Sequence, residues 1–154
     1  MFELENRHFI GGLAPNADFA AGTVYTDVFN IVGDAGYALV WYGTNASSGA
    51  STLTVEACDD TTPTNSTAVA FYYRVATTFD TFGDWTEATT AGITVGGSAD
   101  SAWEIYVPSS ELAQEGYGYM RIKMVESVNQ AADGVVACYV VNPTYPPTSN
   151  SLID

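Results

Sequence analysis

The chain has 154 residues, and its 18 acidic side chains against four basic ones leave a formal net charge of −14. Binding to nucleic acid through phosphates requires clusters of Lys and Arg, and attraction to anionic lipid requires the same, so this composition argues against both kinds of partner. Charged residues make up only 14% of the chain, against about 25% in an average soluble domain, and Thr, Ser, Gly, Ala and Tyr take their place. Such a surface suits broad, flat contact with neighbouring molecules.

The first residues do not have the composition of a targeting signal. Residues 1–10, MFELENRHFI, carry acids where a secretory signal peptide carries Lys or Arg, and no apolar core segment follows. No run approaches the roughly 18 apolar residues of a transmembrane helix. We therefore expect synthesis in a host cytoplasm, where Cys58 and Cys138 remain buried free thiols; a disulfide between them stays open as the alternative.

Strand patterns recur along most of the chain and are separated by turns rich in Gly, Pro, Asn, Asp and Ser. In chain order the predicted strands are 23–32, 37–42, 52–58, 68–76, a weaker 85–89, 92–95, 102–107, 117–128 and 135–141. Only residues 109–114, SSELAQ, have a helical composition, with Ser109 or Ser110 as the expected N-cap. The pattern predicts an all-β fold: a single antiparallel β-sandwich of about seven to nine strands, jelly-roll or immunoglobulin-like in layout.

Period-2 alternation assigns faces within these strands. Residues expected to share a buried face are Leu53, Val55 and Ala57; Phe71, Tyr73 and Val75; Trp103, Ile105 and Val107; and Met120, Ile122 and Met124. Segment 134–141 is almost wholly apolar, which predicts a strand covered on both faces.

The two ends differ from the middle. Residues 1–19 combine scattered apolar side chains with Gly and Pro and show no clean period, which predicts an extended arm packed on its own sandwich or on a neighbour. Residues 142–154, NPTYPPTSNSLID, contain three prolines, which favour extended conformations. We therefore divide the chain into an N-terminal arm (1–19), a sandwich domain (20–141) and a C-terminal tail (142–154), with both ends either loose or ordered by a partner.

No complete catalytic, metal or cofactor constellation is evident, so we expect a protein that is not an enzyme and holds no cofactor. The sole histidine, His8, lies in the irregular first segment without the rigid scaffold that a catalytic base needs. Two cysteines and one histidine do not make a four-ligand zinc site.

Three weaker site hypotheses stay open. A glycosidase needs only two carboxylates, and the candidates are Glu56, Glu104, Glu111, Glu115 and Glu126. The segments 59–65 and 80–84 offer oxygen ligands for calcium, although neither matches an EF-hand loop. Aromatic residues that would suit either a sugar groove or a core and interface are Tyr25, Trp41, Tyr42, Tyr72, Trp85, Trp103 and Tyr117.

Several short segments together resemble a known class of protein. They are 52–58 (TLTVEAC), 70–74 (AFYYR), 111–113 (ELA) with 116–121 (GYGYMR), and 134–137 (GVVA) with 142–145 (NPTY). This sequential pattern, over residues 23–146, resembles the small decoration, or cement, proteins of tailed-bacteriophage capsids. The resemblance implies β-rich subunits in many copies on the outside of an icosahedral shell, held by contacts to the major capsid protein, and it implies no catalytic residue.

The expected function is therefore to bridge capsomers and strengthen the shell, with the protein located in the virion. Self-association as a trimer would match local threefold positions, and the acidic excess would face solvent. The contact residues we predict in the two ends are Phe2, Leu4, Phe9, Ile10 and Tyr145. The alternatives are a carbohydrate-binding module on a virion fibre or spike, and a head–tail or tail component.

Overall fold

The computed structural model describes residues 8–13, 22–31, 37–44, 49–78, 81–96, 100–129 and 135–142, with only the backbone described in 8–13, 37–44 and 135–142. These residues form twelve strands and one short helix. In chain order they are β1 (His8–Leu13), β2 (Thr23–Tyr25), β3 (Phe29–Asn30), β4 (Tyr37–Thr44), β5 (Ala50–Cys58), β6 (Ser66–Val69), β7 (Phe71–Ala76), β8 (Thr86–Ala88), β9 (Ile93–Gly96), β10 (Ser101–Pro108), α1 (Ser109–Gln114), β11 (Tyr119–Val128) and β12 (Val135–Asn142).

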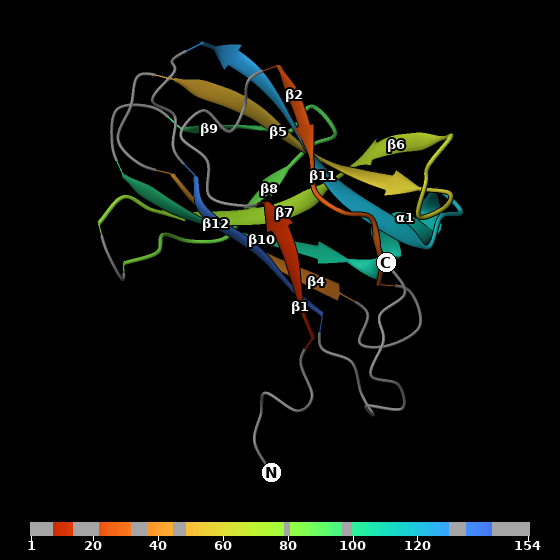
Figure 1. Cartoon of the computed structure of the whole chain (residues 1–154). Helices are drawn as coiled ribbons and strands as arrows, with labels where there is room; N and C mark the ends of the chain where they lie inside the picture. Colours follow the sequence, from red (N-terminus) through yellow and green to blue (C-terminus); the bar gives the residue numbers. More distant parts are fainter. Residues whose placement is uncertain are drawn as a thin grey trace.

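The strands form two antiparallel sheets that face each other (Figure 1). Sheet A has the order β1-β12-β4-β10-β7-β8. Sheet B has the order β2-β11-β5-β6, with β3 also paired to β11 and β9 also paired to β5. The predicted all-β antiparallel sandwich is confirmed.

The strand order selects the jelly-roll layout over the immunoglobulin-like one. The antiparallel pairs β1·β12, β2·β11, β4·β10 and β5·β6 are nested, so that early strands pair with late ones and the pairs alternate between the sheets. A long hairpin wrapped around a barrel-like core produces this nesting, which is the arrangement of a jelly roll. Strands β7 and β8 extend sheet A beyond β10.

Two predicted strands are each divided in the structure. The predicted strand 68–76 is two strands in different sheets, because the chain passes from β6 in sheet B to β7 in sheet A at Ala70. Val69 in β6 and Phe71 in β7 are both buried, so alternate residues remain buried through the crossing. The sequence pattern therefore does not show where the chain changes sheet. The predicted strand 23–32 contains β2 and β3, which are separated by residues 26–28. Among these, the buried Thr26 exchanges hydrogen bonds with the backbone of Ile122 in β11.

The first segment contains a strand that the sequence pattern did not predict. Residues His8–Leu13 form β1, an edge strand of sheet A paired with β12. From the sequence we expect this part of the chain to pack either on its own sandwich or on a neighbouring molecule. Residues 8–13 are part of the chain's own sandwich. The predicted boundary between the N-terminal arm and the sandwich domain, at residue 19, therefore separates β1 from sheet A, to which it belongs.

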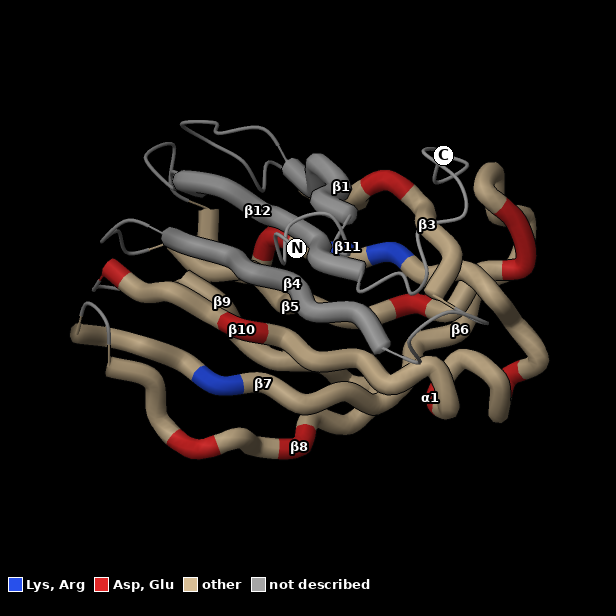
Figure 2. Tube along the Cα trace, turned by 90° about the horizontal axis from the view of Figure 1, so that it is seen from below, with Lys and Arg blue, Asp and Glu red and all other residues tan. Residues whose placement is uncertain are grey.

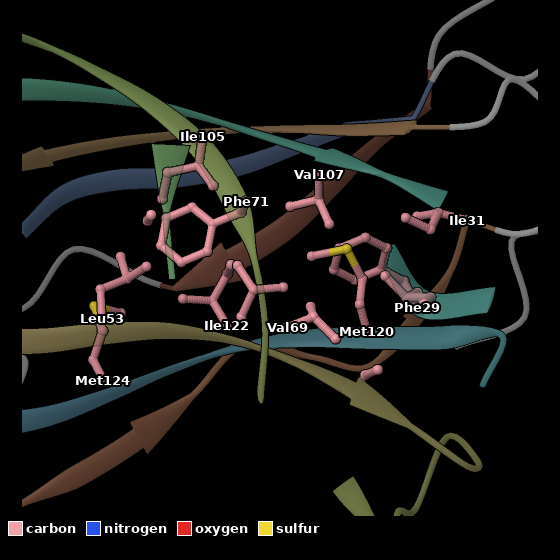
Figure 3. Close-up of a cluster of buried hydrophobic side chains, with 14 of the residues drawn as sticks. Phe29, Ile31, Leu53, Val69, Phe71, Ile105, Val107, Met120, Ile122 and Met124 are labelled. Carbon is pink, nitrogen blue, oxygen red and sulfur yellow. The ribbon is translucent and has the colours of Figure 1, made fainter. Parts of the chain in front are cut away.

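The core lies between the two sheets and is built from alternate residues of facing strands. Figure 3 shows large apolar side chains from both sheets pointing into this space. The largest fully buried ones are Phe29, Phe71, Ile31, Leu53, Ile105, Leu112, Met120, Ile122, Met124 and Val55. Each such side chain contributes about 1.5–3 kcal/mol of burial free energy. The predicted buried faces of β5, β10 and β11 are confirmed.

The short helix forms where it was predicted, but its N-cap was predicted wrongly. Pro108 occupies the N-cap position, and no side chain caps the helix there. Leu112 anchors the helix in the core, with a side chain that is 0% exposed. The helix therefore depends on this packing more than on capping.

Candidate functional site

The outer face of sheet A carries a cluster of aromatic and charged side chains. In β7 and β10 the residues Phe71, Ile105 and Val107 are buried in the core, so the residues between them point outward. These outward residues are paired across the two strands, Tyr72 with Tyr106 and Arg74 with Glu104.

A loop before β8 adds two further rings to this cluster. The loop folds back along β7, because the backbone N–H of Gly83 donates to the carbonyl of Val75 at 3.0 Å. It thereby brings Phe82 and Trp85 against Arg74, whose guanidinium carbon lies 4.9 Å from the centre of each ring. The loop thus fixes the Arg74 side chain between two aromatic groups.

The rings also contact each other. The centre of the Tyr106 ring lies 6.3 Å from that of Tyr72 and 6.2 Å from that of Trp85, the latter in an edge-on arrangement. Trp85 remains 45% exposed and Tyr72 38% exposed. We call this set of six residues the aromatic face: Tyr72, Arg74, Phe82, Trp85, Glu104 and Tyr106.

The single cation of the aromatic face is neutralised within the chain. The Arg74 guanidinium forms an ion pair with the Glu104 carboxylate at 2.5 Å. Figure 2 shows the basic segment of β7 and the acidic segment of β10 on neighbouring strands. On the other side of β7, Glu87 of β8 is the backbone partner of Tyr72, and its side chain is exposed. The face therefore combines exposed rings with a neutralised ion pair, and the exposed acid Glu87 borders it.

The structure places two of the five predicted contact residues relative to this face. Residues that are direct partners across neighbouring strands form rows that run across sheet A. Phe9 belongs to the row that passes through Val141 and Leu39 and reaches Tyr106 and Tyr72 of the aromatic face. Its neighbour Ile10 lies in the adjacent row, which passes through Val140 and Val40 to the buried residue Ile105. The other three, Phe2, Leu4 and Tyr145, lie outside the described residues.

A second charged cluster lies on the outer face of sheet B. The Glu56 carboxylate pairs with Arg121 at 2.7 Å and with Lys123 at 3.1 Å, and Arg121 lies 4.1 Å from the centre of the Tyr25 ring. Burial acts to raise the pKa of Glu56, but the hydrogen bonds and charges of Arg121 and Lys123 outweigh it and hold the pKa below the ordinary value. Alternation in 52–58 predicts that residue 56, on the face opposite Leu53, Val55 and Ala57, is exposed to solvent; this prediction is wrong, since Glu56 is only 7% exposed.

The candidate glycosidase carboxylates lie on several different elements of the fold. Glu56 and Glu104 lie on the outer faces of opposite sheets, and the inner faces of packed sheets are themselves about 10 Å apart. Glu126 accepts a hydrogen bond from the backbone N–H of Gly22 at the edge of sheet B. Glu111 lies in α1 and Glu115 just beyond it. Glu56 and Glu104 therefore do not form a carboxylate pair.

The 59–65 loop closes on itself. The Asp59 carboxylate accepts hydrogen bonds from the backbone and side chain of both Thr64 and Asn65, at 2.9 to 3.2 Å. These bonds lower the pKa of Asp59, that from the Asn65 side chain most of all. The carboxylate thus acts as a turn-forming acceptor. The other segment considered for calcium, 80–84, lies only partly within the described residues.

The structure also locates other residues that the sequence analysis singled out. Trp103 packs with Tyr73 against the core, with ring centres 6.0 Å apart. Cys58 is a buried free thiol, and Cys138 lies in β12, where only the backbone is described. Burial raises the pKa of Cys58 to about 11. His8 and Trp41 lie in β1 and β4, where only the backbone is described.

Within the part of the chain that the structure describes, no group of three or more His, Cys, Asp or Glu side chains is placed to hold a metal ion. In the same residues no helix is long and apolar enough to cross a membrane.

Sequence reasoning named Tyr72 and Trp85 but not Arg74, Phe82 or Tyr106 as members of a site. The alternation in 102–107 already places Tyr106 opposite to the buried residues. Its position beside Tyr72 depends on the register between β10 and β7, however, and these two residues are 34 positions apart in sequence. Only the folded chain, through the paired strands and the loop before β8, brings the six residues together.

Comparison with known proteins identifies no family. No protein-family model matches the chain, and no curated protein matches it. Among solved structures it is similar to a chain in the structure of infectious bursal disease virus strain Gx, at 15% identity and a TM-score of 0.22, over 88% of this chain and 40% of that one. It is similar to a mutant VP2 protein of the same virus in T=1 particles at the same identity and TM-score, over 95% and 42% of the two chains. The chain thus spans less than half of these proteins, and a TM-score this low carries no argument about its function.

Proposed function

We propose that this protein is a non-enzymatic virion component that decorates the outer surface of a phage capsid and stabilises the shell by bridging capsomers. The partner is the major capsid protein, and copies of the chain associate with one another, most simply as a trimer on local threefold positions. The proposal starts from the resemblance of residues 23–146 to capsid decoration proteins.

The observation that carries the binding role is the aromatic face. Tyr, Trp and Arg are the residues most enriched in the energetic centres of protein interfaces, and here Tyr72, Trp85 and Arg74 lie together on the rigid outer side of a sheet. Trp85 keeps 45% of its surface exposed in a chain that has only three Trp residues. A face of this composition is typical of a surface that binds another protein.

Two whole-molecule features agree with this function. Jelly rolls are common among viral capsid domains, an analogy at the level of fold only. The low charge of the chain suits flat contact, and repeated copies on a symmetric shell add avidity to contacts that are individually weak. The acidic excess then faces solvent and keeps particles apart.

The deciding experiment mixes purified protein with undecorated mature capsids and measures occupancy and resistance of the capsids to heat. We expect saturable binding and a higher temperature of genome release. A truncation that removes 1–7 and 143–154 but keeps β1 and β12 tests the contribution of the two ends, including Phe2, Leu4 and Tyr145. Absence of binding by the full-length protein, or binding without added heat resistance, would overturn the proposal.

A carbohydrate-binding module is the second candidate. The exposed rings of Trp85 and Tyr72 lie beside the polar groups of Arg74 and Glu104, and such a combination also suits stacking and hydrogen bonding to a sugar. A glycan array discriminates between the two. Sugar binding that is lost in Trp85→Ala, while the thermal midpoint stays unchanged, would favour this alternative over capsid decoration.

A further inference from the structure

Both described arginines of this chain are held in the same way. Arg74 pairs with the carboxylate of Glu104 and contacts the rings of Phe82 and Trp85. Arg121 pairs with Glu56 and contacts the ring of Tyr25. In each case a guanidinium contacts an aromatic ring and a carboxylate presented by neighbouring segments.

The aromatic face borders a third combination of a ring and a carboxylate. Tyr72 in β7 and Glu87 in β8 are direct backbone partners, so their Cβ atoms lie about 4.5–5.5 Å apart on the same side of the sheet. Tyr72 is 38% exposed and the side chain of Glu87 is also exposed. Among the described residues, no Lys or Arg pairs with Glu87.

We propose that Tyr72 and Glu87 receive an arginine side chain from the partner protein, so that the aromatic face is the surface docked onto the capsid. This inference rests on the proposed function for the identity of the partner, and it adds which face docks and the chemistry of the contact. The arginine packs against the Tyr72 ring and donates to the Glu87 carboxylate.

Charge complementarity selects this occupant. Arg74 is already neutralised by Glu104, whereas Glu87 on the same side of sheet A is an exposed acid, as is Asp84 in the loop before β8. A second copy of this chain is a poorer source of the arginine, because its described cations, Arg74, Arg121 and Lys123, are already paired with its own carboxylates. Arginine is preferred over lysine because its planar, weakly hydrated guanidinium stacks on a ring and donates to a carboxylate at the same time.

The test measures affinity for undecorated capsids with five proteins: wild type, Glu87→Arg, Glu87→Gln, Tyr72→Ala and the control Glu115→Arg. The control makes the same charge reversal at an exposed site beyond α1. We expect Glu87→Arg to weaken binding by about thirtyfold or more and Tyr72→Ala by about tenfold, with Glu115→Arg within about twofold of wild type. Glu87→Gln is expected to reduce the salt dependence of binding. Unchanged circular dichroism and thermal midpoints establish that each variant is folded.

The outcomes separate the two proposals. If Glu87→Arg and Tyr72→Ala bind capsids as tightly as wild type does, the proposed docking face is wrong, and capsid decoration itself still stands. If wild type does not bind capsids, capsid decoration fails, and the arginine site is tested by nuclear magnetic resonance titration with blocked tri-arginine and tri-lysine peptides. Amide shifts at residues 72 and 87 that are larger with tri-arginine and are lost in Glu87→Gln support the site, whereas equal shifts with both peptides overturn it.

Discussion

Glu56 is a nearly buried carboxylate held by two cations on the outer face of sheet B. Arg121 and Lys123 both reach it, from β11, the strand next to β5. Its side chain is 9% exposed, while that of Lys123 is 32% exposed. Removal of the carboxylate would leave two positive charges without their partner in a partly desolvated position.

We expect Glu56→Gln to lower the free energy of unfolding by about 2 kcal/mol at neutral pH. This is less than the roughly 3–5 kcal/mol of a fully buried pair, because Lys123 is partly solvated. Urea unfolding measures the loss, with Glu115→Gln at an exposed site as the control, for which a change within about 0.5 kcal/mol is expected. A loss no larger than that of the control would contradict this role of the pair.

The same pair predicts a pH dependence. The pKa of Glu56 is lower in the folded protein than its ordinary value of 4.5, so the group contributes stability above that pH and loses it as the pH falls through the folded pKa. The difference in unfolding free energy between wild type and Glu56→Gln should therefore be constant from pH 7 to about pH 5 and shrink below about pH 4.5. Urea titrations across this range check it, and a difference that stays constant down to pH 3 would exclude the linkage.

Cys58 is expected to be inert in the folded protein. Burial raises its pKa to about 11, and the charges of Glu56 and Asp59 add to this effect against the opposing charge of Arg121. At pH 8 only about 0.1% of the thiol is then ionised, and the buried sulfur is also inaccessible to reagents. Iodoacetamide labelling followed by peptide mass spectrometry should show no modification of Cys58 until urea unfolds the chain. Rapid native labelling of Cys58 would refute this.

At the scale of elements, the turn that leads into β9 depends on one glycine. Gly92 has a φ of +79°, and a Cβ atom there would lie 2.2 Å from the carbonyl oxygen of Leu53 in β5. The backbone of the turn approaches the neighbouring strand too closely for any side chain. Gly116, after α1, also has a positive φ (+77°), but a Cβ there would meet open space.

These two glycines make a matched pair of substitutions. We expect Gly116→Ala to cost about 1–2 kcal/mol, which is the conformational penalty alone. Gly92→Ala should cost more, about 3 kcal/mol or above, because β9 must move away from β5 to relieve the contact. Denaturant unfolding of both variants gives the comparison. Equal losses would mean that the close approach at Gly92 has no energetic consequence.

For the whole molecule, charge repulsion opposes folding. The three described cations, Arg74, Arg121 and Lys123, are each in an ion pair, but the chain has 18 acidic residues against four basic ones, so these pairs leave its net charge at −14. Salt screens repulsion between exposed charges more than it weakens a nearly buried pair such as that of Glu56.

We therefore expect the thermal midpoint to rise between low salt and about 0.5 M KCl. The rise should be about 2–4 °C for each kcal/mol of repulsion that is relieved. Differential scanning calorimetry at several salt concentrations measures it, with Glu56→Gln run in parallel to separate the ion pair from the general repulsion. A midpoint that falls as salt is added would show that ion pairs dominate instead.

The amino-acid sequence by itself determined the fold class and most of the core. Alternation in 52–58, 102–107 and 117–128 identified the buried faces correctly, because these strands bury one side and the pattern depends only on the chain's own period of two. Composition determined the acidic, weakly charged character of the surface. The helical turn at 109–114 was also local enough to be found.

The tertiary structure alone decided which strands are partners, and with them the candidate site. The crossing between sheets at Ala70 could not be seen in the sequence, because the alternation of buried residues continues from β6 into β7. The strand β1 was missed because its glycines and its place at a sheet edge hide the period. Glu56 finds Arg121 from 65 residues away, and Tyr72 finds Tyr106 through the register of β7 and β10. Such contacts depend on strand order and register, which are set by the free energy of the whole packed sandwich and not by any one segment.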